Sequence, residues 1–245
     1  MNESVTIVFI CLLAVTAFLY ASVGHGGASG YLALGALFGI QAVVMKPSAL
    51  ILNIIVSGVA FFHYYRGGHF KWKLFWPFAI TSVPASFLGS FITLDETIYK
   101  KILGALLLFA VLQIVGIFGK GKSEIKEPVL WIALATGGAI GLLSGMIGIG
   151  GGIILTPVLI LMGWAGLKET AAVSAIFILV NSISGLSGMM IKGFTIPNEV
   201  FVWLVVAAVG GFAGSWAGSF RFGGFALRGI LAVTLAIACF KLILT

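Results

Sequence analysis

The chain has 245 residues, of which 60% are hydrophobic and 9% are charged, and its mean hydropathy is +1.19. A soluble globular surface needs more charge, so this composition excludes a soluble protein and indicates one that lies almost wholly in a membrane. The net charge of +7 does not indicate nucleic-acid binding, because the basic residues are spread over short loops, where they set membrane topology.

The first predicted element is an apolar helix over residues 5–23. Glu3 precedes it without any lysine or arginine, so the segment lacks the basic region of a cleavable signal peptide and is expected to be retained. Cys11 lies in this helix and Cys239 in the last apolar segment, where cysteine ordinarily serves as a small hydrophobic residue. We therefore expect no disulfide, no metal site and no cofactor.

Further apolar segments follow along the chain, and we predict an all-α polytopic membrane protein. They lie at 28–44, 48–65, 74–93, 99–118, 129–147, 151–165, 171–191, 197–218 and 225–244. A full membrane span needs about 20 apolar residues, so the short segments after each glycine cluster indicate a half-helix or a re-entrant hairpin.

The hydrophilic stretch 120–128 lies at the midpoint and reads as a linker between a first membrane repeat, 1–119, and a second one, 129–245. Several landmarks recur in the same order in both halves, among them Asn53 and Asn181. This order indicates a duplication into two repeats of about five hydrophobic segments each. If each half crosses the membrane an odd number of times, the second repeat is inverted relative to the first.

Basic residues give the orientation, since cytoplasmic loops carry more lysine and arginine. The loop that holds Arg66, Lys71 and Lys73 is expected on the cytoplasmic side, together with the linker. Lys46 and Lys192 are expected on the opposite side.

A glycine cluster interrupts each half, at Val23–Ala28 and at Ile147–Gly152, with Gly24 and Gly148 placed 124 residues apart. In hydrocarbon, a broken helix is tolerated only where it is buried in protein or lines a polar cavity. The amides at the start of the following half-helix then form a ready anion site. Paired breaks of this kind indicate a secondary transporter whose small anionic substrate lies where the two halves meet.

The candidate substrate contacts follow from these two clusters and from the paired asparagines. They are Gly24, His25, Gly26, Gly27, Ala28, Ser29, Asn53, Gly148, Gly150, Gly151, Gly152 and Asn181. His25 is the ionisable residue of the clusters, so it is a candidate for proton coupling or for binding the anion; alternatively, it caps a backbone carbonyl. The two asparagines either face the anion or join helices by hydrogen bonds.

The seven carboxylates lie at or near predicted loops or segment ends, which disfavours a cation pump. Neither glycine cluster continues into a nucleotide-binding motif. An intramembrane enzyme is disfavoured because His25 and Ser29 lack a second buried histidine or acid. An anion channel with the same amide-lined site remains the main alternative to a carrier.

The chain resembles the sulfite exporter TauE/SafE family of membrane permeases. The resemblance rests on Gly24–Gly27, on Gly148–Gly152 followed by Thr156-Pro157, and on the helix Ala171–Gly185. It implies export, or uptake in some members, of sulfur-containing anions such as sulfite or organosulfonates such as sulfoacetate. The contacts it implies come from the two glycine clusters and from Asn53 and Asn181. We expect a multi-pass protein of a bacterial inner membrane whose partners are a small anion and lipid; the anion, the direction and the coupling ion stay open.

Overall fold

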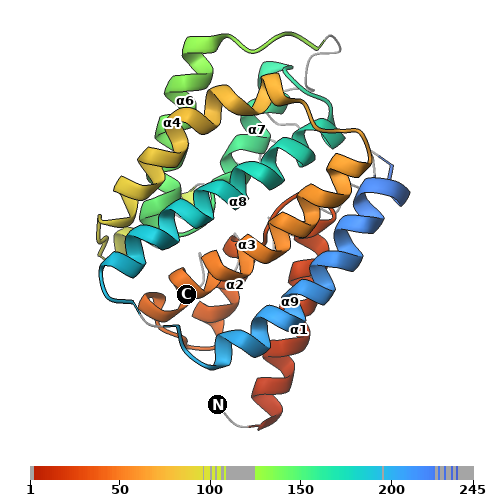
Figure 1. The fold of residues 1–245 in the computed structure, drawn as a ribbon. Coiled ribbons are helices and arrows are strands. Elements are labelled where there is room, and N and C mark those ends of the chain that lie inside the picture. The colour runs from red at the N-terminus through yellow and green to blue at the C-terminus, as the bar shows by residue number, and fades with distance from the viewer. Residues whose placement is uncertain are drawn as a thin grey trace.

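The structure is a computed structural model that describes residues 3–95, 97–99, 101–102, 104–105, 108, 125–194 and 196–223, with isolated positions beyond. Within these residues it is helical and without strands, which confirms the predicted all-α class (Figure 1). The helices are α1 (Glu3–Ala21), α2 (Ala28–Leu37), α3 (Ala42–Arg66), α4 (Trp72–Ser90), α6 (Leu130–Ile147), α7 (Gly152–Met162), α8 (Leu167–Ile191) and α9 (Glu199–Trp216). A short π-helix, η1 (Ala217–Arg221), continues α9.

In the described part of the chain, five helical stretches are long and apolar enough to cross a membrane: Ser4–Ala21, Ala42–Arg66, Leu130–Ile147, Leu167–Ile191 and Glu199–Arg221. They confirm a multi-pass integral membrane protein. Many of their large apolar side chains face outward, as a lipid-facing surface requires.

The two short helices follow the glycine clusters, as predicted. Helix α2 has 10 residues and α7 has 11, so at 1.5 Å per residue each covers about half of a hydrocarbon core. The predicted end of the first one was wrong, however. Helix α2 ends at Leu37, and the chain turns through Gly39, whose φ of 70° suits glycine, before α3 begins at Ala42. Pro47 therefore lies inside α3 rather than ahead of it.

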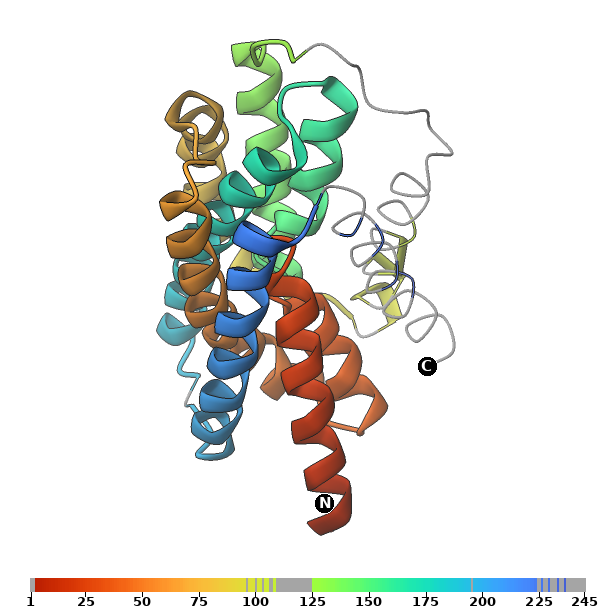
Figure 2. The same cartoon turned by 90° about the vertical axis from the view of Figure 1, so that its right-hand side faces the viewer.

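Helices α3 and α8 pack against each other at the centre, with α1 and α9 paired on one side and α4 and α6 paired on the other. Figures 1 and 2 show α9 running along α1. The two halves pack in a similar way. Helix α1 pairs with α9 as α6 pairs with α4, and α9 packs on α3 as α4 packs on α8. Helices at corresponding places in the two halves also run in opposite directions; α3 and α8, for example, are antiparallel (Figure 1).

Small residues allow these close pairings. A Cβ at Gly141 or Gly145 would overlap the backbone of α4 at Ser82 or Ser86, and one at Gly214 would overlap the carbonyl of Phe18 in α1. These glycines of α6 and α9 thus allow the helices to approach closely.

The predicted segments 99–118 and 225–244 lie largely outside the described residues, as does most of the linker 120–128. The division into repeats 1–119 and 129–245 and their inversion stay predictions for this reason.

Candidate functional site

The first break separates α1 from α2. Gly24 and Gly27 adopt φ angles of 77° and 96°, which residues other than glycine rarely adopt. Gly24 also passes so close to α8 that a Cβ there would overlap the carbonyl of Ala171. Helix α2 then begins at Ala28. The chain therefore turns deep inside the protein, where the residues Ser22–Leu34 are buried.

The second break separates α6 from α7. Helix α6 ends at Ile147, and α7 begins at Gly152. Between them, Gly148, Gly150 and Gly151 have φ angles of 83°, 74° and 80°. The residues of this turn are also buried. Each half thus carries a short helix whose N-terminal turn lies in the interior.

Asn53 of α3 joins the two breaks. Its Oδ1 accepts a hydrogen bond from the backbone amide of Ala28, at 3.0 Å. Its Nδ2 lies 3.4 Å from the carbonyl oxygen of Ile149 and 3.4 Å from Oγ of Ser182, and donates to both. The side chain is fully buried. One amide group therefore caps the start of α2 and holds the turn before α7.

The two breaks also pack on the same side chains. A Cβ at Gly150 would lie 2.7 Å from Nδ2 of Asn53 and 2.8 Å from Cγ2 of Ile178. A Cβ at Gly26 would overlap Oδ1 of Asn53 and would lie 3.1 Å from the same methyl group of Ile178. The backbones of both halves approach one point beside Asn53, and any side chain at either glycine would fill it.

His25 provides a second link between the halves. Its ring is 2% exposed, with Nδ1 3.1 Å from the carbonyl oxygen of Val23 and Nε2 3.2 Å from Oγ1 of Thr156 in α7. Thr156 lies in turn 2.9 Å from Oγ of Ser174 in α8. When Nδ1–H donates to Val23, Nε2 is left to accept from the Thr156 hydroxyl. His25 therefore caps a carbonyl, as one interpretation expected, and also contacts the opposite half.

Other predicted contacts lie elsewhere. Ser29 donates to the hydroxyl of Tyr20 in α1, at 3.1 Å, and so bonds within its own half. Nδ2 of Asn181 donates to Oγ of Ser82, at 3.1 Å, and to the carbonyl of Phe177, at 2.8 Å. Within the described residues, Asn181 hydrogen-bonds to neither break, and it joins α8 to α4.

Sequence reasoning did not select Thr156, Ile178 or Ser182 as site residues. Ser182 directly follows Asn181, and Thr156 lies in the segment that carried the family resemblance. The positions of these residues in the sequence gave no reason to distinguish them from residues that only pack against their neighbours.

The two ends of the molecule differ. At one end, Nζ of Lys71 lies 2.6 Å from Oε1 of Glu169. Lys168 donates to the carbonyl of Ser219, at 2.8 Å. These contacts tie the starts of α4 and α8 to η1. Tyr64 adds a hydrogen bond of 2.6 Å from its hydroxyl to the carbonyl of Ser22.

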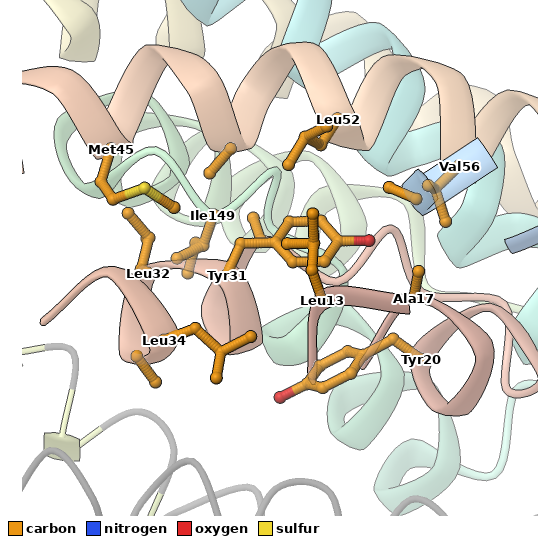
Figure 3. Close-up of a cluster of buried hydrophobic side chains, with 14 of the residues drawn as sticks. Leu13, Ala17, Tyr20, Tyr31, Leu32, Leu34, Met45, Leu52, Val56 and Ile149 are labelled. Atoms are coloured by element: carbon orange, nitrogen blue, oxygen red, sulfur yellow. The ribbon is translucent and has the colours of Figure 1, made fainter. Parts of the chain in front are cut away.

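The other end is open. A cavity of about 1090 Å³ lies between the end of α2, the start of α3 and the ends of α4 and α8. Lys46 and Lys192 line it, and the described residues of its wall include no aspartate or glutamate. Figure 3 shows Ile149 of the second break beside Leu32 and Met45, two residues that also line the cavity.

The described residues hold no cluster of three or more histidine, cysteine or acidic side chains that could bind a metal ion. Among their buried polar and charged side chains there is no aspartate, glutamate, lysine or arginine. The site therefore offers amide, hydroxyl and imidazole groups.

A helical membrane protein with two buried breaks that meet at one point falls in the class of membrane transporters, and comparison with known proteins agrees. The chain belongs to the family described as "Sulfite exporter TauE/SafE", whose pattern matches residues 8–242. It is similar to "Probable membrane transporter protein y4hK" of Sinorhizobium fredii, with 37% identity over 233 residues that cover 94% of each chain.

Two more distant relatives carry similar names. "Probable membrane transporter protein YdhB" of Bacillus subtilis is 26% identical over 224 residues, which cover 86% of this chain and 87% of the relative. A probable membrane transporter protein of Haemophilus influenzae is 26% identical over 206 residues, which cover 78% and 77%. No solved structure matches the chain significantly. The protein is a membrane transporter of this family.

Proposed function

We propose that the protein is a secondary transporter, an exporter, of small sulfur-containing anions such as sulfite or organosulfonates such as sulfoacetate, and that it works by alternating access. The observation that carries the proposal is the position of Asn53, which hydrogen-bonds to Ala28 at one break and to Ile149 at the other. The substrate lies beside this residue, between the N-terminal turns of α2 and α7.

The chemistry of the site supports an anion. The N-terminal turns of α2 and α7 bring backbone amides and the positive ends of two helix dipoles into the interior. No buried carboxylate of the described residues competes for these donors. The hydroxyl of Thr156, the side-chain amide of Asn53 and the ring of His25 can add hydrogen bonds to an oxyanion.

The difference between the two ends supports a carrier rather than a channel. The Lys71–Glu169 and Lys168–Ser219 contacts hold one end together, whereas the other end has the open cavity. A channel with an open path would show access from both ends at once. The opposite directions of corresponding helices support the inverted repeat on which alternating access is built.

The family name supports sulfur-containing anions as the substrate class. Sulfite and sulfonates present several negatively charged oxygens that suit a cage of amide and hydroxyl donors. A buried carboxylate would repel such a ligand, and none is buried in the described part of the site.

Flux measurements in proteoliposomes test the proposal. Sulfite and sulfoacetate should be taken up with a rate that saturates, and an excess of unlabelled anion inside the vesicles should accelerate uptake of labelled anion. Acetate, phosphate and taurine serve as comparison solutes. A flux that rises linearly with concentration and lacks counterflow would identify a channel instead. Absence of both anions from the transported solutes would reject the substrate class.

A further inference from the structure

The open cavity contains a cation whose hydrogen-bonding capacity is unused. Nζ of Lys46 lies 4.0 Å from the centre of the Tyr99 ring. Within the described residues it makes no ion pair and no hydrogen bond. Lys192, on the same cavity, differs: its Nζ donates to the carbonyl of Phe91, at 2.6 Å, and lies 3.5 Å from Oγ1 of Thr93. The ammonium group of Lys46 can therefore donate hydrogen bonds to a ligand, whereas that of Lys192 already donates to the protein.

Tyr99 gives an independent sign of a ligand. Its side chain is 5% exposed, and its buried hydroxyl has no hydrogen-bond partner among the described residues. A buried hydroxyl without a partner costs about 1–3 kcal/mol. A ligand that accepts a hydrogen bond from this hydroxyl and a charge-assisted one from Lys46 would remove that cost.

We propose that Lys46 and Tyr99 form a capture site for a small oxyanion in the cavity, separate from the Asn53 site; an anion that enters from the side of Lys46 occupies it before the Asn53 site, and an exported anion occupies it afterwards. The proposal rests on the proposed function. The ammonium of Lys46 neutralises the anion and donates to one of its oxygens, and the hydroxyl of Tyr99 donates to another. The absence of acidic side chains from the described cavity wall favours an anion over a cation.

The position of Lys46 connects the two sites. A Cβ at Gly148 would lie 3.4 Å from Cβ of Lys46, so the capture site borders the first residue of the second break. Met146, at the end of α6, lines the same cavity. An anion held by Lys46 thus lies beside the turn that contains Ile149. The carbonyl oxygen of Ile149 accepts a hydrogen bond from Asn53. Ile149 of this turn packs in one apolar cluster with Leu32 and Met45, which line the cavity (Figure 3).

The test compares initial rates of sulfite and sulfoacetate uptake for Lys46→Gln, Tyr99→Phe and the double variant in proteoliposomes. Lys46→Gln should raise KM about tenfold, the effect of losing one charge-assisted hydrogen bond, with the maximal rate nearly unchanged. Tyr99→Phe should raise KM by a smaller factor. The double variant should resemble Lys46→Gln, since both residues act on one ligand. Lys73→Gln, which removes a lysine outside the cavity, is the control for net charge and should behave as wild type.

The outcomes separate this proposal from the proposed function. Saturable transport by the wild type with unchanged KM in Lys46→Gln and Tyr99→Phe overturns the capture site alone. Failure of the wild type to transport either anion, and to bind it in calorimetry of the detergent-purified protein, overturns both. If Lys46→Gln does not fold, Tyr99→Phe decides, because it removes a single oxygen atom that bonds to no described residue; an unchanged KM in that variant rejects the site.

Discussion

The side-chain amide of Asn53 donates to the carbonyl of Ile149 at 3.4 Å, so a helix of the first half holds the break of the second. The same side chain accepts from the amide of Ala28 in its own half. Because one group is bonded to both breaks, a movement of either one must break or shift these bonds. A substrate bound between the two breaks could therefore rearrange these hydrogen bonds.

The first prediction concerns this residue. Asn53→Leu should reduce sulfite or sulfoacetate transport at least tenfold, because it removes the side-chain donor at the site and leaves the Ile149 carbonyl without its partner. The free energy of unfolding should fall by about 1–3 kcal/mol for the unpaired buried groups. Transport in proteoliposomes and thermal unfolding in detergent measure the two effects.

Asn181→Leu is the matched control, since Asn181 is equally buried in α8 but bonds to Ser82 and Phe177. It should lose comparable stability and keep its KM. Equal losses of transport in the two variants would show that Asn181 also contacts substrate, as the repeat symmetry suggested, and would contradict the site described above.

Gly150→Ala is predicted to abolish transport. Its Cβ would lie 2.7 Å from Nδ2 of Asn53 and 2.9 Å from Oγ of Ser182, and the φ of 74° adds about 1 kcal/mol of backbone strain. Gly68→Ala carries the same strain at a φ of 75°, but its Cβ would meet nothing within 4 Å. Gly68→Ala should therefore lose stability and retain transport. Equal transport by both variants would mean that the space beside Asn53 is not used by substrate.

The breaks themselves could be predicted because glycine clusters between apolar segments have few other uses in a membrane. Gly24, Gly27, Gly150 and Gly151 all adopt positive φ angles at these turns. The end of α2 was not predicted well: the predicted segment 28–44 runs past Gly39, where the chain turns, and α3 begins at Ala42 and continues through Pro47 as helix.

The side chains around the breaks were harder to predict, since the repeat symmetry fails there. Asn53 and Asn181 match in the sequence, yet Asn53 joins the breaks and Asn181 joins α8 to α4. His25 contacts Thr156 of the other half, while Ile149 takes the corresponding place in the second cluster. Such contacts between residues 131 positions apart depend on how the halves pack, which no local pattern records.

His69 should give the protein a pH-dependent stability. It lies in the loop between α3 and α4, where burial, and then the positive charge of Lys168, hold its pKa below the ordinary value. The folded protein thus binds the proton less well than the unfolded chain, so this contribution to stability is present above about pH 6.5 and is lost as the pH falls further. His69→Gln should flatten the dependence of Tm on pH between about 7 and 5. Lys168→Gln should flatten this dependence in part. If the dependence of Tm on pH is unchanged in His69→Gln, another group is responsible for it.

The last prediction separates the two roles of His25. As a proton-coupling group, it must be titratable; as a cap for the carbonyl of Val23, it needs only a donor, which glutamine can supply. His25→Gln should therefore insert and fold, and transport by this variant should lose its response to an imposed pH gradient. Thr156→Val removes the hydroxyl next to Nε2 but leaves the ring titratable, so its transport should slow while the response to the gradient persists. Uptake driven by a pH gradient in vesicles measures both variants. A gradient response that survives in His25→Gln would exclude His25 as the coupling group and leave it the roles of carbonyl cap and anion contact.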